Sequence, residues 1–126
     1  MPFRLITHNV GSVNSIGNVI FLAGEERYAC PHSTFMFHGV GFDLQGSLRL
    51  EEKLLLERLG SIKSDQDKIG SIIRERTALD ANIVEGLFRE AQTKDANYAA
   101  ANGIIHGIKD VNIPPGAPIL QLVFQR

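Results

Sequence analysis

The first third of the chain alternates between short extended runs and one compact apolar segment. Residues 3–7 alternate in polarity, and residues 27–30 and 34–38 form two further short apolar runs, so all three are predicted to be strands. Residues 15–23 are apolar nearly all round, which predicts a short buried helix after a turn at residues 11–14. The predicted order is strand, helix, strand, strand.

A seven-residue repeat dominates the middle of the chain. Aliphatic residues recur at intervals of seven from Leu48 to Ile69, while the polar Gln66 interrupts the companion apolar series. The pattern predicts a helix over residues 47–77. A helix of about 30 residues is longer than a small domain needs for its own core. We therefore expect one stripe to pack against another subunit; the alternative is a helix lying across its own domain.

The last third predicts shorter elements. Aspartate precedes each of two predicted helices, at residues 81–90 and 96–102, and is a favourable N-cap there. A strand is predicted at residues 104–108, and a strand or an arm at residues 119–125. Strands that alternate with helices predict an α/β fold with a largely parallel sheet. The length favours one domain, residues 1–126.

Composition narrows the possible environments and partners. With 44% hydrophobic residues the chain can bury a sizeable core, and its net charge of −1 gives no reason to expect nucleic acid or an anionic membrane as a partner. No apolar run approaches the roughly 20 residues that a membrane-spanning helix requires. The N-terminus is not a signal peptide, because its apolar stretch is too short. The single cysteine excludes an internal disulfide. We expect a cytoplasmic protein.

A serine stands where the short apolar helix is predicted to begin. The Ser15 hydroxyl would lie near the free N–H groups of a helix N-terminus, and the amide of Ile16 beside it is a candidate oxyanion donor. The alternative is that Ser15 only caps the helix, which is a common role of serine.

A histidine ends the second of the two apolar runs that follow. We expect His38 to be partly exposed at a sheet edge, where imidazole is suited to act as a general base. The alternative is a structural histidine bonded to a backbone carbonyl. A serine nucleophile and a histidine base are the smallest set of side chains that supports nucleophilic acyl transfer of this kind. No spacing fits a metal-binding or dinucleotide motif, so we expect neither a metal nor a cofactor.

Residues 11–38 resemble the nucleophile region of the Clp protease proteolytic subunit, within the ClpP/crotonase superfamily. That family reads roughly Gly-x-Ala-Ala-Ser-Met-Gly, then an apolar helix ending in Ala-Gly, then Arg-x-x-x-Pro-Asn-Ser and Met-Ile-His. Here residues 11–17 read Gly-Ser-Val-Asn-Ser-Ile-Gly, residues 27–33 read Arg-Tyr-Ala-Cys-Pro-His-Ser, and residues 36–38 read Met-Phe-His. A looser match covers most of the remaining chain.

The resemblance implies roles for these residues. It makes Ser15 the nucleophile, His38 the general base and the Ile16 amide an oxyanion donor, and it makes residues 47–77 the handle helix that interlocks rings of subunits. It also implies a β-β-α superhelix, a peptide or unfolded protein as substrate, and assembly as a homo-oligomer. An ATPase unfoldase is the partner that such a subunit would have.

Two departures from the family pattern concern the remaining catalytic groups. The triad aspartate of the family falls, by ungapped counting, on Ala91, and Glu90 is the nearest acid and the candidate third member. The glycine pair that supplies a further oxyanion donor lies upstream of the strand that opens this chain, and the sequence contains no Gly-Gly. We therefore expect an N-terminally incomplete domain that lacks its usual first strand–helix units.

Three functions follow from the resemblance and its departures. The leading hypothesis is a serine endopeptidase subunit with impaired catalytic machinery. The alternative is a catalytically inactive assembly subunit that keeps the handle helix. A crotonase-type acyl-CoA enzyme is less favoured, because crotonases usually use acidic residues and two backbone donors rather than a Ser–His pair.

Overall fold

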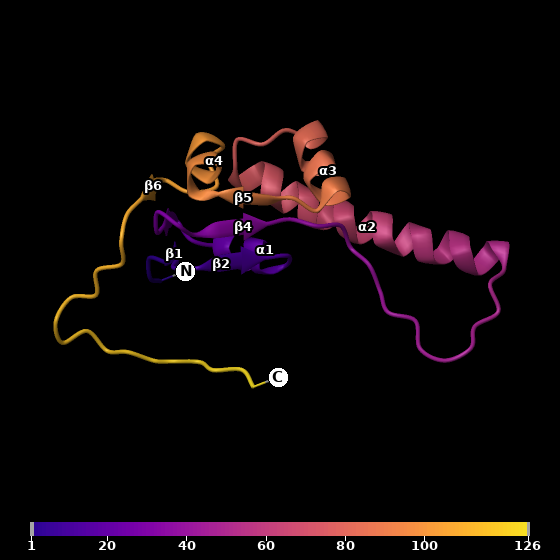
Figure 1. Ribbon diagram of the computed structural model, residues 1–126, viewed down its shortest axis with the longest axis horizontal. Coiled ribbons are helices and arrows are strands. Elements are labelled where there is room, and N and C mark those ends of the chain that lie inside the picture. Colours follow the sequence, from indigo (N-terminus) through magenta and orange to yellow (C-terminus); the bar gives the residue numbers. More distant parts are fainter. Residues whose placement is uncertain (1, 126) are drawn as a thin grey trace.

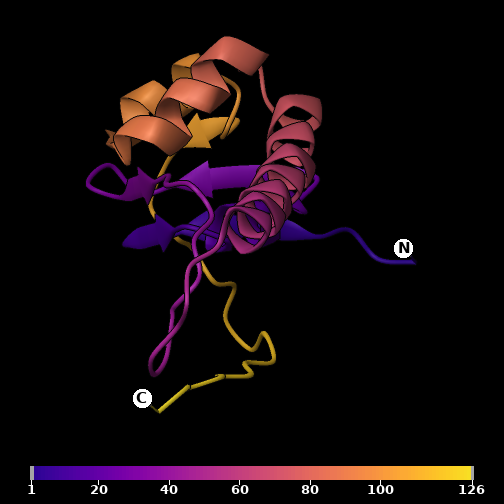
Figure 2. The same ribbon diagram turned by 90° about the vertical axis from the view of Figure 1, so that its right-hand side faces the viewer.

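The computed structural model describes residues 2–125, which fold into a mixed α/β arrangement (Figure 1). The strands are β1 (Ile6–Asn9), β2 (Ser12–Asn14), β3 (Glu26–Ala29), β4 (Thr34–Met36), β5 (Thr93–Asp95) and β6 (Gly107–Ile108). The helices are α1 (Gly17–Leu22), α2 (Glu52–Arg76), α3 (Ala81–Glu90) and α4 (Ala96–Ala101). In both ribbon views, helices α2, α3 and α4 lie on one side of the strands (Figures 1 and 2).

The strands form two small sheets. One sheet has the order β1-β3-β6 with parallel pairing, and the other has the order β2-β4-β5, in which β2 and β4 are parallel and β4 and β5 are antiparallel. The α/β class and the largely parallel pairing are confirmed. The strands are divided between two sheets, although the pattern favoured one.

Two short strands differ from the prediction. Residues 11–14 were expected to be a turn, which is wrong, because β2 pairs with β4 in register from Ser12 opposite Thr34 to Asn14 opposite Met36. Strand β5 was not predicted at all. Both strands have only three residues, most of them polar, so their order comes from pairing with β4 rather than from a local pattern.

Helix α1 is buried on one face only, so the expectation of burial all round is wrong. Phe21 and Leu22 are buried, whereas Ile20 is 70% exposed. The ring of Phe21 packs edge-on against Phe35 of β4, with 5.2 Å between the ring centroids. The contact fixes the core-facing side of α1 and leaves the opposite side uncovered within residues 2–125.

Helix α2 begins at Glu52, five residues later than predicted. Leu48 and Leu50 before it are exposed, so no packing offsets the cost of ordering another helical turn. Ile73, in the last turns, is buried in the core, whereas Leu55 and Leu59 in the first turns are exposed. The helix therefore covers its own domain with one end and extends beyond the body with the other (Figure 1).

The two predicted aspartate caps are confirmed. The Asp80 carboxylate accepts a hydrogen bond from the Ile83 N–H at 2.9 Å, and the Asp95 carboxylate accepts one from the Tyr98 N–H at 2.8 Å. A cap of this kind contributes about 1 kcal/mol. Helix α3 has its predicted bounds, and α4 ends at Ala101, one residue before the predicted end.

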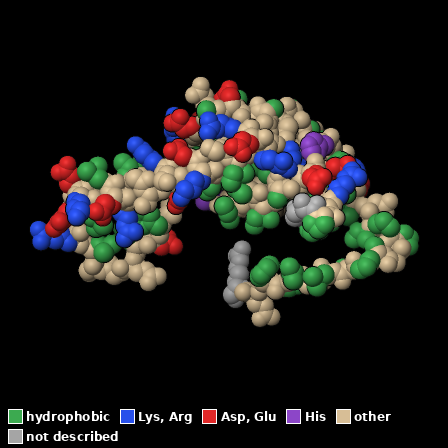
Figure 3. Space-filling model, turned by 180° about the vertical axis from the view of Figure 1, so that it is seen from behind, with side chains coloured by type: hydrophobic (Ala, Val, Ile, Leu, Met, Phe, Trp, Pro, Cys, Tyr) green, Lys and Arg blue, Asp and Glu red, His purple; other side chains and the backbone are tan. Residues whose placement is uncertain are grey.

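The chain leaves the body after β6. Only residues 107–108 of the predicted strand at 104–108 are a strand, because Ile104 and Ile105 are instead buried in the core. Residues 119–125 form no strand and extend as an arm with exposed apolar side chains (Figures 1 and 3). None of the helices within residues 2–125 combines the length and the apolar character needed to traverse a lipid bilayer.

Candidate functional site

Ser15 occupies a sharp turn between β2 and α1. Its φ of 56° lies in the left-handed region, which is unfavourable for a residue other than glycine. The Ser15 N–H donates to the Met36 carbonyl at 2.9 Å, which extends the pairing of β2 with β4 by one residue. Strain of this kind persists where surrounding contacts impose it, and it is frequent at functional sites.

The side chain of Ser15 does not cap α1. The N-cap residue is Ile16, and no side chain makes a capping hydrogen bond there. Among residues 2–125 neither the Ser15 Oγ nor the Ile16 N–H has a hydrogen-bond partner. The capping role of Ser15 is therefore not observed, and its hydroxyl is half-buried and available.

His38 follows β4 and is exposed. Its Nδ1 lies 2.7 Å from the carbonyl oxygen of the next residue, Gly39. Such a bond requires that Nδ1 carry the proton, which leaves the lone pair of Nε2 free to accept one. Because the two residues are adjacent in the chain, the bond connects no separate elements and orients the ring only.

Ser15 and His38 line the same cavity. It has a volume of about 240 Å³, and most of its remaining lining is apolar or glycine. The lining residues are Ser15, Ile16, Phe37, His38, Gly39, Val40, Gly41, Ile69, Ile73 and Phe88. Within residues 2–125 no hydrogen bond joins the Ser15 hydroxyl to the His38 ring. The two predicted residues thus line one cavity without a hydrogen bond between their side chains.

The segment that carries His38 is fastened to α2 and α3. The Gly39 N–H donates to the Phe88 carbonyl at 3.0 Å, and the Val40 N–H donates to the Gln66 Oε1 at 3.1 Å. A Cβ at Gly39 would lie 2.7 Å from the same Gln66 oxygen, so a larger residue at this position would displace the Gln66 side chain. Sequence reasoning did not assign Gln66 a role at the site; its polar side chain within the apolar series was the available signal.

No carboxylate within residues 2–125 is bonded to His38. The Glu90 carboxylate accepts a hydrogen bond from the Gln92 side chain, so its predicted role as the third catalytic residue stays a prediction. The Phe37 N–H donates to the Gln92 carbonyl at 3.1 Å, and this β4–β5 register, continued by one residue, aligns His38 with Ala91. Ala91 has a φ of 48°.

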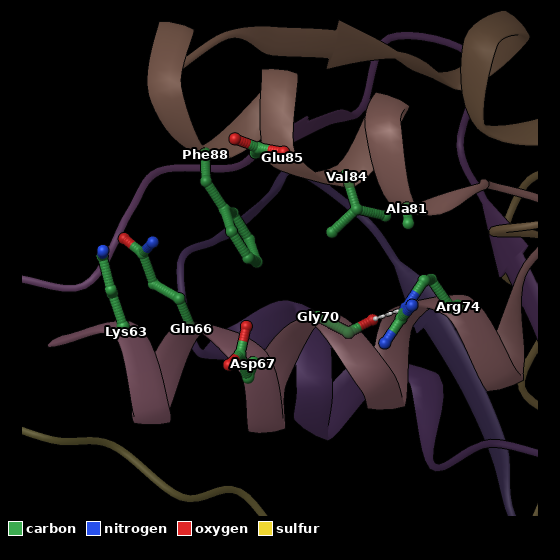
Figure 4. Close-up of a pocket in the computed structure, with 9 residues that line it drawn as sticks. All are labelled: Lys63, Gln66, Asp67, Gly70, Arg74, Ala81, Val84, Glu85 and Phe88. Carbon is green, nitrogen blue, oxygen red and sulfur yellow. Dashed lines mark hydrogen bonds between the residues drawn. The ribbon is translucent and has the colours of Figure 1, made fainter. Parts of the chain in front are cut away.

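A second hollow lies between α2 and α3 (Figure 4). It measures about 380 Å³ and mixes basic side chains, Lys63 and Arg74, with acidic ones, Asp67 and Glu85. Phe88 lines this hollow as well as the Ser15–His38 cavity. Because the larger hollow contains neither predicted residue, the smaller cavity is the candidate active site.

A buried guanidinium lies away from the candidate active site. Arg27 donates to the carbonyls of Gly24, Arg76, Gly103 and Ile104, and its pKa is lowered by burial and by the nearby Arg76. The His106 Nδ1 accepts the Arg27 N–H at 3.0 Å. These contacts join the end of α2 to β3, which is a structural role.

Comparison with known proteins assigns the family. Among residues 2–125, no group of three histidine, cysteine, aspartate or glutamate side chains is placed to hold a metal ion. No curated protein matches the chain. The family model described as Clp protease matches residues 1–112. The chain therefore belongs to the Clp protease family.

Proposed function

We propose that the chain is a serine-type peptidase subunit in which Ser15 is the nucleophile and His38 is the general base. The observation that carries the proposal is their shared cavity, into which Ser15 comes on a strained turn with its hydroxyl unengaged. Membership of the Clp protease family supports a peptidase of this general kind.

The reaction would proceed by acyl transfer. His38 Nε2 accepts the Ser15 Oγ proton as the oxygen attacks a peptide carbonyl, and the Ile16 N–H donates to the oxyanion. The histidine then protonates the leaving amine as the C–N bond breaks, and water releases the acyl group. Hydroxyl and imidazole approach within bonding distance when substrate binds, since catalytic contacts are often loose in a free enzyme.

The Gly39 carbonyl takes the orienting role on the far side of the imidazole. It accepts a hydrogen bond from the Nδ1–H, with 2.7 Å between nitrogen and oxygen, and this leaves Nε2 as the base. A neutral carbonyl stabilises the imidazolium less than a carboxylate does, so we expect slow turnover. Replacement of the triad acid by its amide costs about 10⁴ in rate in a serine protease.

The cavity lining favours an apolar substrate side chain. Ile69, Ile73 and Phe88 contribute apolar surface, and His38 is the one ionisable side chain of the lining. We infer that peptides or unfolded proteins bind with an apolar residue next to the scissile bond. The wider proposal is a cytoplasmic homo-oligomer of β-β-α superhelical subunits, assembled through α2, with an ATPase unfoldase as partner.

Hydrolysis of a short fluorogenic peptide with an apolar residue before the reporter tests the proposal. We expect Ser15→Ala and His38→Ala to abolish hydrolysis. Ser12→Ala is the matched control, because Ser12 is an exposed serine of the same segment whose Oγ lies 3.2 Å from the Thr34 hydroxyl. Glu90→Gln in the same assay tests the predicted role of Glu90. Hydrolysis that survives Ser15→Ala would refute the proposal.

A second candidate is the catalytically inactive assembly subunit. Counting against the family pattern puts Ala91 at the position of the triad aspartate, and the Glu90 carboxylate is engaged by Gln92. A protein that forms a ring-sized oligomer but hydrolyses no peptide would favour this function over the first.

A further inference from the structure

Asn18 links the two segments that carry the proposed catalytic pair. It lies in the first turn of α1 and is 2% exposed. Its Nδ2 donates to the Ser15 carbonyl at 3.0 Å and to the Met36 carbonyl at 2.8 Å. Ser15 forms the strained turn, and Met36 ends the strand that leads to His38. One amide group thus joins the segment of Ser15 to the segment that leads to His38.

These side-chain bonds reinforce bonds that the backbone already makes. The Asn18 N–H donates to the Ser15 carbonyl at 3.0 Å, and the Ser15 N–H donates to the Met36 carbonyl at 2.9 Å. Each carbonyl therefore has a donor without the amide. An apolar side chain in place of Asn18 would leave neither carbonyl unpaired.

The amide also leaves an oxygen without a partner. Among residues 2–125, the Asn18 Oδ1 is the buried side-chain polar atom that has no hydrogen bond. A buried acceptor without a donor is unfavourable for folding. The need to pair the backbone carbonyls with hydrogen-bond donors therefore does not explain why this residue is an asparagine. What the amide adds is a fixed position of the Ser15 turn relative to the end of β4.

We propose that Asn18 is a positioning residue that fixes the Ser15 turn relative to the end of β4, and so relative to the segment that carries His38. The inference rests on the proposed function. A left-handed backbone at a non-glycine residue needs surroundings that impose it. One Nδ2 bond holds the Ser15 carbonyl of that turn, and the other holds the Met36 carbonyl of β4, to which the Ser15 N–H also donates. Small misplacements of reacting groups cost far more in rate than in stability.

The matched control is Asn9. It is 3% exposed, its Nδ2 donates to the Thr34 carbonyl of the same strand β4 at 2.8 Å, and its Oδ1 accepts the Gly11 N–H at 3.0 Å. Asn9→Ala therefore removes a comparable buried amide that joins a turn to β4, but at the end of the strand away from His38.

The test follows phosphonylation of Ser15 in the full chain by a fluorophosphonate, with release of fluoride, over a range of reagent concentrations. For Asn18→Ala we expect the maximal labelling rate to fall about tenfold or more, while the half-saturating concentration changes less than about twofold. For Asn9→Ala we expect both to stay within about twofold of wild type. Asn18→Ser, which keeps one short donor, should give an intermediate rate and replaces Asn18→Ala if that variant does not fold.

Full labelling speed in Asn18→Ala, or an equal loss in Asn9→Ala, would overturn the inference. If wild-type Ser15 takes no label, the proposed function fails instead, and amide hydrogen exchange then decides the role of Asn18. Faster exchange of the Ser15 N–H in Asn18→Ala than in Asn9→Ala would support positioning, and equal exchange would contradict it.

Discussion

At Ser15 the backbone conformation determines how the side chain can be used. A φ of 56° turns the chain from β2 into α1, and the hydroxyl neither caps the helix nor bonds to another group within residues 2–125. His38 is oriented by the carbonyl of its own neighbour, so its free nitrogen is Nε2. The proposed pair thus has a hydroxyl and a ring nitrogen without hydrogen-bond partners within residues 2–125, and no carboxylate of that range is bonded to the His38 ring.

Supplying that carboxylate should raise activity. Aspartate tolerates the left-handed φ of 48° at Ala91 better than alanine does, and the β4–β5 register aligns this position with His38. We expect Ala91→Asp to increase kcat for peptide hydrolysis by about tenfold or more, with KM nearly unchanged. Ala91→Asn is the isosteric control without charge. If the two variants hydrolyse peptide equally fast, the assignment of position 91 is wrong.

His106 should make stability depend on pH. Burial, together with the charges of Arg27 and Arg76, lowers the pKa of His106 from its usual 6.5. Because the pKa is lower in the folded chain, the unfolded chain binds a proton at His106 more readily. The contribution of neutral His106 to the free energy of unfolding is therefore complete above about pH 6.5. It is lost as the pH falls through the lowered pKa of the folded chain. Urea unfolding between about pH 7.5 and 5 measures the effect.

The control for that measurement is His106→Asn, whose side-chain oxygen can accept the Arg27 N–H but does not titrate. We expect the wild-type urea midpoint to fall more steeply with decreasing pH than the midpoint of this variant. Parallel curves would show that His106 contributes nothing to the pH dependence.

At the scale of elements, α2 both supports the site and extends beyond it. Ile69 and Ile73 of α2 line the cavity. Gln66, three residues before Ile69 on the same helix, accepts a hydrogen bond from the Val40 N–H in the segment after His38. A polar residue within an apolar series thus serves the site rather than the core. The loop at residues 39–41 depends on α2 for its position.

Removing the Gln66 acceptor should impair the site with little effect on the helix. We expect Gln66→Leu, which completes the apolar series, to lower the rate of peptide hydrolysis by about tenfold and to leave the melting temperature nearly unchanged. Gln66→Glu keeps an acceptor oxygen and should stay within about threefold of wild type. Equal rates for wild type and Gln66→Leu would contradict the role of this contact.

The elements that sequence predicted well are those whose signals are local. Helix α3 follows from an aspartate cap and a periodic apolar face, and its bounds agree with the prediction. Strands β2 and β5 were missed because each has three residues, too few to show a periodic pattern, and both are ordered by pairing with β4. The start of α2 was placed too early because an apolar repeat does not report whether anything packs against it.

The candidate site divides in the same way. Ser15 and His38 were predicted because Ser15 begins one recognisable apolar run, His38 ends another, and both fall in the segment that resembles the nucleophile region of the family. Asn18 and Phe88 were not, since their contribution depends on contacts between segments distant in sequence. The predicted role of Glu90 came from counting along the chain, which does not give the direction of its side chain.

At the scale of the whole molecule, the apolar surface exposed on α2 and on the arm is the feature that motivates the proposed assembly. Leu55 and Leu59 on the distal turns of α2 are 52% and 46% exposed, and the arm at residues 119–125 is apolar throughout much of its length (Figure 3). Contiguous apolar surface of this kind usually marks an interaction site. Family membership makes a homo-oligomer the natural expectation.

Negative charges in place of Leu55 and Leu59 should break the proposed assembly. We expect Leu55→Glu combined with Leu59→Glu to lower the mass measured by light scattering to that of a smaller species, while circular dichroism stays unchanged. Ser64→Glu is the control, because Ser64 lies two and a half turns beyond Leu55 on the opposite side of the helix at about 3.6 residues a turn. An unchanged mass in the double variant would exclude α2 as the contact.

The most direct test of the central claim is the site of fluorophosphonate attachment in the full chain, mapped by peptide mass spectrometry. A serine activated by a histidine reacts with such a reagent, whereas an unactivated serine does not. We predict one adduct, on Ser15, that disappears in His38→Ala and persists in Ser12→Ala. No adduct on the wild-type chain, or an adduct on a different serine, would contradict the assignment of Ser15 and His38.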